Sequence, residues 1–276
     1  MKLFENFIGQ EKIQERFYYL LEYYKTTKEK FPHILLIGPH GYGKTTFARL
    51  LGNQLCLIKD GVFFEVLIGS DIKKIINFFR GETKNIFFFI DEIHKLKNVE
   101  YLFQFMEKSN VTIIGATTKE GNLDKPFLSR FKIIEYFKPY SNDEMIEILR
   151  QNSEGENFSY EILQKIIDIA PNIRVLLNFF KQMIILKKSL PNLSEKELYE
   201  KTLYLLDLDE RGLDYKQRMY IELLRAHKEL SLKRIALLLQ TSEETVETLI
   251  EPLLFKRGYI TITEKGRRLN ELANNL

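Results

Sequence analysis

The chain has 276 residues, enough for two or three small domains with a sizeable core. Hydrophobic residues make up 45% and charged residues 29% of it, which excludes a disordered or fibrous protein. The 41 Lys and Arg against 38 Asp and Glu leave a net charge of +3, so that any contact with DNA must be local.

The sequence carries no sign of export or of membrane contact. Its single cysteine, Cys56, excludes an internal disulfide and indicates a reducing compartment. The N-terminus lacks the charged and then apolar pattern of a signal peptide, and no apolar run approaches the length of a membrane span. We therefore expect a cytoplasmic protein that makes no membrane contact.

The N-terminal segment predicts one amphipathic helix. After Gly9-Gln10, apolar residues recur at helical spacing up to about Lys30. We interpret this stripe as facing the core; its members are Ile13, Phe17, Leu20, Leu21 and Tyr24.

A glycine-rich turn follows the first predicted strand, Ile34–Ile37, and leads into a helix pattern at Thr45. Gly38, Gly43, Lys44 and Thr45 match the G-x-x-x-x-G-K-[ST] pattern of a P-loop. Because glycine lacks Cβ, such a loop can curl until its N–H groups and the positive helix end meet a phosphate. Lys44 would contact the β- and γ-phosphates and Thr45 would offer a hydroxyl to Mg²⁺. The turn therefore predicts a bound nucleoside triphosphate.

Four more apolar runs follow, each rich in β-branched or aromatic residues and separated from the next by helical or turn segments. They cover residues 62–67, 86–90, 111–115 and 133–137. Together with the first strand they predict a five-stranded parallel sheet with helices on both faces, an α/β domain of residues 1–139.

Residues 140–207 show helix patterns without strands and predict a small helical domain. Ser141 with Glu144, and Ser194 with Glu197, each fit a capping box. Pro171 separates two of the helices.

Residues 208–276 read as helix, helix, turn, helix and β-hairpin, the order of a winged helix. Thr241 with Glu244 fits a capping box at the third helix, which runs to about Phe255. A winged helix can bind DNA or serve only as a protein-interaction module. The basic clusters at residues 256–257 and 265–268 favour DNA.

Two acidic residues, Asp91 and Glu92, directly follow the strand at 86–90. Beside a P-loop, Asp91 would help to hold Mg²⁺ through its water shell, and Glu92 would polarise the attacking water as general base. The alternative is a solvated pair at a strand end. His94 has no second His or Cys at metal-ligand spacing, so we interpret it as a group that packs beside the pair.

Three further residues are candidates by position. Thr118 ends the next strand, where its hydroxyl would face the γ-phosphate or the attacking water, although Thr is also a common strand residue. Arg130 precedes the last strand and is either a surface arginine or a finger that reaches a neighbouring subunit, which implies an oligomer. Arg174 opens a helix after Pro171-Asn172, and the pattern alone does not decide whether it reaches the phosphates.

In this order the motifs resemble an AAA+ ATPase and, more narrowly, the RuvB family, the motor of Holliday junction branch migration. The Walker motifs occur in any P-loop ATPase, whereas the C-terminal matches narrow the resemblance to RuvB. The matching segments are 7–12 (FIGQEK), 38–46 (Walker A), 91–94 (Walker B), 115–118 (sensor 1), Arg174 (sensor 2), 209–214 (DERGLD), 250–253, 257–259 and 266–267.

The resemblance implies ATP and Mg²⁺, a hexameric ring around duplex DNA or a four-way junction, and a RuvA-like partner. It also implies the following roles. ATP is held by Ile8, Gly38, Gly41, Gly43, Lys44, Thr45, Thr46, Asp91, Phe137, Arg174 and a neighbour's Arg130; Mg²⁺ by Thr45 and Asp91; catalysis rests on Lys44, Glu92, Thr118 and Arg130; DNA phosphates are contacted by Lys265, Arg267 and Arg268.

The chain departs from the family pattern at three places. Leu128 stands where the family usually has the first of two arginines, and Ile262 stands where its wing has a further arginine. Residues 95–111 hold one short helix pattern instead of the long insertion whose β-hairpin docks on RuvA. We therefore expect a RuvB-type motor, or alternatively an ATP-switched DNA-binding adaptor or loader that does not translocate.

Overall fold

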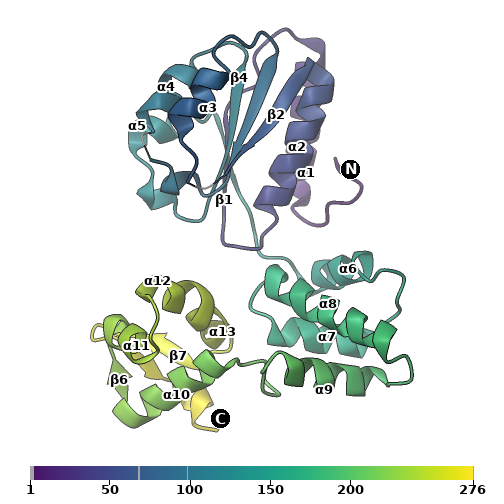
Figure 1. Cartoon of the computed structure of the whole chain (residues 1–276), viewed down its shortest axis with the longest axis vertical. Helices are drawn as coiled ribbons and strands as arrows, with labels where there is room; N and C mark the ends of the chain where they lie inside the picture. The colour runs from purple at the N-terminus through teal and green to yellow at the C-terminus, as the bar shows by residue number, and fades with distance from the viewer. Residues whose placement is uncertain (1–2, 68, 98, 276) are drawn as a thin grey trace. The chain divides into compact units, whose positions relative to one another are not determined.

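The computed structural model describes residues 3–67, 69–97 and 99–275 and divides into two compact units, Met1–Ser141 and Asn142–Leu276 (Figure 1). We treat each unit by itself. Among the described residues, no helix has both the length and the apolar character needed to cross a membrane.

The first unit is built on a five-stranded sheet in which each strand is parallel to its neighbours, as the sequence predicted. The order is β2-β3-β4-β1-β5, so that β1, which precedes the P-loop, lies between β4 and β5. The strands are β1 (Ile34–Ile37), β2 (Gly61–Val66), β3 (Asn85–Ile90), β4 (Val111–Thr117) and β5 (Ile133–Tyr136).

Helices cover both faces of this sheet (Figure 1). Phe87 and Phe89 of β3 pack in the cluster that contains α1 and α2, whereas Phe88 packs against Phe79 and Phe105 on the other face. This alternation, together with the place of β3 between β2 and β4, makes β3 a strand buried on both faces. The helical elements are α1 (Glu11–Thr26), α2 (Lys44–Lys59), α3 (Ile72–Phe78), η1 (Ile93–Lys95), α4 (Glu100–Met106), η2 (Glu120–Asn122) and α5 (Lys125–Leu128).

The second unit begins with four helices around their own apolar cluster. Ser194 and Glu197 form the predicted capping box. The helices are α6 (Asn142–Gln151), α7 (Tyr160–Ile169), α8 (Ile173–Ser189) and α9 (Glu195–Leu205). We call residues 142–208 the helical half; the domain boundary predicted at residue 207 stays a prediction.

The rest of this unit, residues 209–275, is the winged-helix half, with a separate apolar cluster. Its sheet has the order β6-β8-β7, and the two-residue β6 was not predicted because so short a strand has no periodicity to detect. The elements are α10 (Tyr215–His227), β6 (Glu229–Leu230), α11 (Leu232–Leu238), α12 (Glu243–Thr245), the π-helix η3 (Val246–Ile250), α13 (Glu251–Lys256), β7 (Ile260–Ile262), β8 (Arg267–Leu269) and η4 (Glu271–Asn275).

One predicted cap in this half is wrong by one residue. Ser242, not Thr241, caps α12, and its side chain accepts a hydrogen bond from the Thr245 N–H. Thr241 instead closes the preceding helix, since its N–H donates to the Ala236 carbonyl at 2.9 Å.

Candidate nucleotide site and DNA-binding surface

The P-loop turns tightly between β1 and α2, with positive φ at Gly38, Gly41 and Gly43. The need for glycine is clearest at Gly43, where φ is 88°. A Cβ there would lie 2.4 Å from the Tyr140 hydroxyl and 3.1 Å from the Phe7 ring. Any side chain would therefore push these covering groups off the loop.

Lys44 begins α2 and is buried, so that its ammonium lies within the loop. Its Nζ donates to the carbonyls of Gly38 at 2.6 Å and Pro39 at 2.8 Å. The N–H groups of Lys44, Thr45 and Thr46 belong to the first turn of α2, which has no intrahelical acceptor for them. The loop thus gathers a cation and the positive end of a helix, the requirements of a phosphate site.

The acidic pair lies where β3 ends, next to the start of α2. The Thr45 hydroxyl donates to Asp91 Oδ2 at 2.8 Å, and Asp91 Oδ1 accepts the Glu92 N–H at 2.9 Å. Glu92 has a left-handed backbone, with φ of 47°, which is unfavourable for a residue with a side chain. This backbone turns the largely buried Glu92 carboxylate toward the end of β4.

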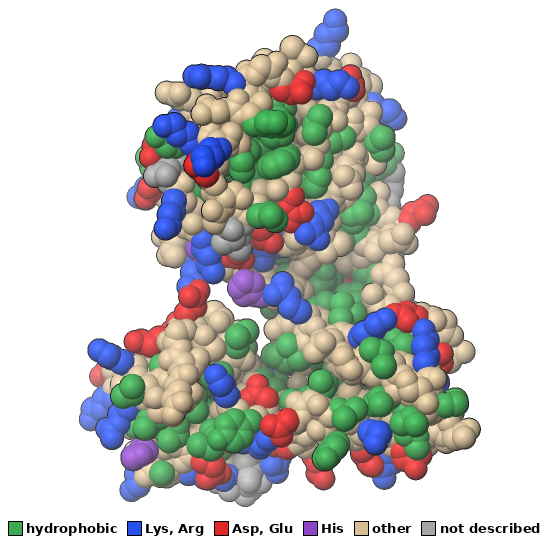
Figure 2. All heavy atoms as spheres, viewed as in Figure 1, with side chains coloured by type: hydrophobic (Ala, Val, Ile, Leu, Met, Phe, Trp, Pro, Cys, Tyr) green, Lys and Arg blue, Asp and Glu red, His purple; other side chains and the backbone are tan. Residues whose placement is uncertain are grey.

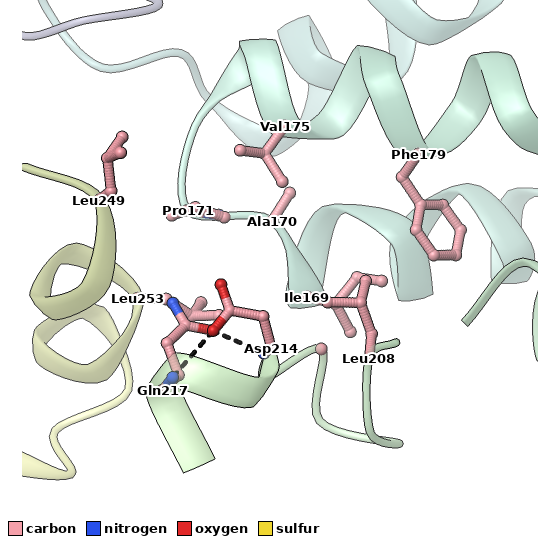
Figure 3. A pocket seen from close by; sticks show the side chains of 11 residues that line it. Ile169, Ala170, Pro171, Val175, Phe179, Leu208, Asp214, Gln217, Leu249 and Leu253 are labelled. Carbon is pink, nitrogen blue, oxygen red and sulfur yellow. Dashed lines mark hydrogen bonds between the residues drawn. The ribbon is translucent and has the colours of Figure 1, made fainter. Parts of the chain in front are cut away.

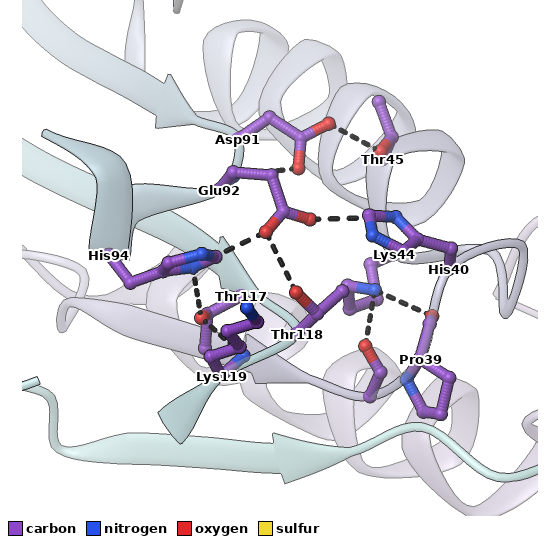
Figure 4. A network of polar contacts seen from close by, with 11 residues as sticks. Pro39, His40, Lys44, Thr45, Asp91, Glu92, His94, Thr117, Thr118 and Lys119 are labelled. Carbon is purple, nitrogen blue, oxygen red and sulfur yellow. Dashed lines mark hydrogen bonds and ion pairs between the residues drawn. The ribbon is translucent and has the colours of Figure 1, made fainter. Parts of the chain in front are cut away.

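Glu92 is the centre of a polar network (Figure 4). Its Oε2 accepts the Thr118 hydroxyl at 2.9 Å and lies 3.3 Å from His94 Nδ1. His94 Nδ1 is also 2.8 Å from the Thr117 hydroxyl, and His40 Nδ1 lies 3.8 Å from the second Glu92 oxygen. Burial lowers the pKa of His94, and the Glu92 carboxylate opposes that shift. His94 therefore favours the neutral form, as a polar neighbour that orients the carboxylate.

The N-terminal segment packs over this loop. Ile8 is buried, and Gln10 is tied to Lys138, accepting its N–H at 3.1 Å and donating to its carbonyl at 2.7 Å. The buried Gln14 donates to two backbone carbonyls of the same segment at 2.7 and 3.2 Å. Phe137 is buried against Gly38.

Arg130 lies at the edge of the sheet where the strands begin, opposite the carboxyl edge that holds the P-loop. It precedes β5 and forms an ion pair with Glu107, which precedes β4, while its guanidinium stacks on Phe103 with 4.6 Å to the ring centre. Asp91 and Thr118 follow β3 and β4 at the carboxyl edge. A strand such as β4, with seven residues, separates the two edges by roughly 20 Å. Arg130 therefore cannot reach the P-loop of its own unit.

A buried histidine, His33, lies beside Arg130 at this amino edge. Its Nδ1 accepts the Ile113 N–H at 2.8 Å, so the ring proton is on Nε2, which donates to the Met106 carbonyl at 3.0 Å. Burial, followed by the nearby Lys30 ammonium, lowers the pKa of His33 to about 4.

Of the remaining predicted nucleotide contacts, Arg174 belongs to the second unit. It is the second residue of α8, and its side chain is exposed. The helix is capped by the Asn172 side chain, which accepts the Val175 N–H at 3.1 Å.

The three predicted DNA contacts differ in their surroundings. Lys265 and Arg268 are exposed on the wing, whereas the Arg267 side chain is 12% exposed. Arg267 Nε donates to Glu251 at 2.9 Å, and the buried Tyr220 hydroxyl donates to the same oxygen at 2.7 Å. The Arg267 guanidinium thus lies largely buried, with Nε on Glu251 and Nη2 3.5 Å from the half-exposed Glu247.

The third helix of the winged-helix half, which begins at α12 and continues into η3, is acidic, with Glu243, Glu244 and Glu247 exposed. The exposed basic residues lie elsewhere in the winged-helix half. A Cβ on Gly266, in the wing turn, would be 2.1 Å from the Leu230 carbonyl oxygen, so this turn lies against the start of α11. The exposed cations on α11, on β8 and in the turns beside them are Lys228, Lys233, Arg234, Lys265 and Arg268. Figure 2 shows Lys and Arg side chains on this part of the winged-helix half.

Comparison with known proteins decides the family. Residues 1–114 match the family model of the Holliday junction DNA helicase RuvB P-loop domain, and residues 210–276 match that of the RuvB C-terminal winged helix domain. A Holliday junction branch migration complex subunit RuvB from Prochlorococcus marinus (strain MIT 9312) is 30% identical, over 98% of this chain and 84% of that protein. The chain belongs to the RuvB family.

A RuvB from Lactobacillus gasseri shares 27% identity over 99% of the chain and 88% of its own length. The Thermotoga maritima RuvB Holliday junction branch migration motor superposes with a TM-score of 0.84 at 25% identity, covering all of this chain and 96% of that one. The alignment to the Lactobacillus protein spans 305 positions against 276 residues here, so this RuvB relative has residues without a counterpart in the chain.

Family membership makes the short connection between β3 and β4 notable. In this RuvB-family chain, the described residues 91–97 and 99–110 form η1 and α4 and contain no strand. The other two departures lie at element ends: Leu128 ends α5, and Ile262 ends β7 with 59% of its surface exposed.

The structure also adds residues that sequence reasoning missed. Thr117, His40 and Gln10 were not assigned, although each lies beside a predicted site residue or the segment that covers the loop. Gln10 was detectable, since it lies inside the FIGQEK motif. His40 carried no signal beyond its place in the P-loop, because its distance to Glu92 depends on how the strands are ordered.

Proposed function

We propose that this RuvB-family protein hydrolyses ATP to drive branch migration of Holliday junctions. One observation carries the proposal most directly. The P-loop, Thr45, Asp91, Glu92 and Thr118 converge at one edge of the sheet, in a chain that ends in a RuvB winged helix. A phosphate site, a buried carboxylate and a DNA-binding module are the minimum parts of a DNA-dependent ATPase.

In this proposal ATP binds at the P-loop with its phosphates on Lys44 and on the N–H groups of Gly43, Thr45 and Thr46. The phosphates compete for the Lys44 ammonium with the carbonyls that it now contacts. Ile8 and Phe137 line the nucleotide from the covering segment and the end of β5, and Gly38 and Gly41 shape the loop.

Thr45 and Asp91 fit a Mg²⁺ ion. The Thr45 hydroxyl would bind the ion directly and Asp91 would hold it through the ion's water shell; their facing oxygens are 2.8 Å apart. No group of three His, Cys, Asp or Glu side chains gathers among the described residues, which suits an ion that keeps waters and phosphate oxygens as ligands. The ion would neutralise charge on the phosphates.

Glu92 is the proposed general base. Thr118 holds one of its oxygens and His94 lies beside the same oxygen, so the carboxylate is oriented before the water arrives. The second oxygen, near His40, is the one that we assign to the attacking water.

Arg130 is the proposed finger. Its place at the far edge of the sheet supports action on the nucleotide of a neighbouring subunit, and hence a ring, which we propose to be hexameric as in the sequence prediction. Glu107 must release the guanidinium when the neighbour's phosphates approach. Arg174 would meet the nucleotide of its own subunit from the helical half.

DNA contact in this proposal is made to phosphates by Lys265 and Arg268, with Lys233 and Arg234 beside them. Such contact tolerates any sequence, which a motor needs because it must leave each position. The acidic third helix supports phosphate contact by the wing. If that helix entered a DNA groove, its carboxylates would be repelled by the phosphates of the DNA backbone.

The region between β3 and β4 limits how a protein partner can bind. A RuvA-like protein would have to dock without a β-hairpin from the region between β3 and β4. The second candidate function, an ATP-switched adaptor that does not translocate, is favoured by that short region alone.

Branch migration of a synthetic four-way junction, with and without RuvA from the same organism, tests the proposal. A motor converts junctions to products in an ATP-dependent reaction and hydrolyses ATP faster on DNA. ATP-dependent DNA binding with few turnovers and no products would replace the motor with the adaptor.

A further inference from the structure

The end of α7 joins the helical half to the winged-helix half. Lys256 Nζ donates to the Ala170 carbonyl at 2.8 Å, and Arg257 Nη2 donates to the Asp168 carbonyl at 3.0 Å. The last carbonyls of a helix have no partner within it and carry the negative end of its dipole. Two neighbouring cations from α13 therefore bind the end of α7 as its external cap.

These contacts redefine a basic cluster that the sequence assigned to DNA. Burial of its ammonium end lowers the pKa of Lys256, although much of the side chain stays exposed, and the Asp168 carboxylate opposes that shift. The polar ends of Lys256 and Arg257 are directed at protein carbonyls of the helical half.

The connecting segment at residues 209–214, the DERGLD motif, also packs against the end of α7. Gly212 has φ of 75°, and a Cβ on it would lie 2.5 Å from Ile169 Cβ at the end of α7. The Asp209 carboxylate accepts the N–H groups of residues 211 and 213 at 3.0 and 2.8 Å. Arg218 donates to the Asp207 carboxylate at 2.9 Å and to its carbonyl at 3.0 Å. The linker is thus a closed, hydrogen-bonded loop.

An apolar cavity of about 90 Å³ lies beside these contacts, between the helical half and the winged-helix half (Figure 3). Pro171 and Val175 of the helical half face it together with Leu249 and Leu253 of the winged-helix half. Its small volume suits side-chain packing and leaves no room for a drug-sized ligand.

We propose that Lys256, Arg257 and Gly212 couple ATP hydrolysis to DNA movement by making the helical half and the winged helix a single lever. The inference rests on the proposed motor function. The end of α7 leads within four residues from Ala170 to Arg174, the proposed nucleotide contact. A displacement that begins at the nucleotide then reaches the wing, because the helical half and the winged-helix half move together and do not bend at a hinge between them. Lys256 and Arg257 are positioning residues, since they touch neither nucleotide nor DNA.

The test uses the full-length chain with Lys256→Met and Arg257→Met together, which keep apolar stems but remove both caps. Spin labels at Lys201→Cys in α9 and Leu237→Cys in α11, both exposed, report the distance between the halves in a Cys56→Ala background. We expect a narrow distance distribution in the parent and one at least twice as broad in the variant.

The second measurement is the coupling of ATP hydrolysis to branch migration, given as the number of junctions migrated per ATP hydrolysed. We expect ATP turnover and DNA affinity to stay within about twofold of the parent, while junctions migrated per ATP fall at least tenfold. The matched control is Lys265→Met on the wing, which should lower DNA affinity and leave the distance narrow. Replacing Lys256 with Arg in place of Met keeps a hydrogen-bond donor at this position. This Lys256→Arg protein should regain the coupling that the Met variant loses, provided that circular dichroism shows an intact fold.

Two results would overturn the inference: an unbroadened distance in the double variant, or a loss of DNA affinity equal to that of Lys265→Met. If the parent itself migrates no junction, the proposed motor function fails, while the distance measurement still decides whether the cap holds the two halves together.

Discussion

Arg267 offers the sharpest test of how the winged helix is built. The sequence places it among the DNA contacts, yet its guanidinium is held by Glu251, whose side chain is 3% exposed. Replacing Arg267 with Met removes the only cation that Glu251 contacts among the described ion pairs. An enclosed carboxylate left with only the Tyr220 hydroxyl costs about 3–5 kcal/mol of folding free energy.

Urea unfolding, followed by a spectroscopic signal from the winged-helix half, measures this loss of folding free energy. Arg268→Met is the matched control, because Arg268 is the next residue, is exposed and forms no ion pair among the described residues. It should change the unfolding free energy by at most about 0.5 kcal/mol, lower DNA affinity, and reduce the salt slope of binding by about 1. Adding Glu251→Gln to Arg267→Met removes the stranded charge and should recover much of the stability.

The reasoning is refuted by an Arg267→Met protein that unfolds like the parent and loses DNA affinity as Arg268→Met does. Arg267 would then be a phosphate contact, as the sequence suggested. A full loss of stability that Glu251→Gln fails to recover would equally show that the ion pair is not its source.

Three further outcomes are expected. Glu92→Gln should bind ATP with unchanged affinity and slow turnover by roughly 10²–10⁴, and unchanged turnover would remove Glu92 from the mechanism. Arg130→Ala should lose about 10³–10⁵ in turnover, and mixing it with inactive Lys44→Ala subunits should restore part of the activity, which a finger acting within its own subunit cannot do. His33 has its pKa lowered to about 4 in the folded state, so its contribution to stability is present above about pH 6.5 and is lost as the pH falls toward 4. The loss is about 3 kcal/mol, measured by urea unfolding of the first unit, and should be absent in His33→Gln.

Much of the fold was predictable because its signals are local. Each strand of the first unit is a short apolar run, and the P-loop needs only glycines, Lys44 and Thr45 at fixed spacing. Asp91 and Glu92 were found in the same way, since a carboxylate pair directly after a buried strand must emerge at the carboxyl edge of a parallel sheet.

The contacts that the sequence did not reveal share a different property: their partners are distant in the sequence or lie on another element. Lys256 binds a carbonyl 86 residues away, and Arg267 binds a carboxylate 16 residues away on another element. Charge and spacing alone predicted DNA contact for both, and that remains a prediction. The edge strand β6 was missed because two residues have no period, and it exists through its pairing with β8.

The sequence by itself determined which residues can do chemistry: a loop for phosphates, an acidic pair and a C-terminal winged helix, because these depend on residue type and near-neighbour spacing. Only the tertiary structure decided which cations are free to act. Packing buries Arg267 on Glu251, turns Lys256 and Arg257 onto the end of α7, and places Arg130 at the far edge of the sheet from the P-loop. A charged side chain near an unpaired carbonyl or a buried carboxylate is bound there by electrostatics, and that proximity exists only once the chain has folded.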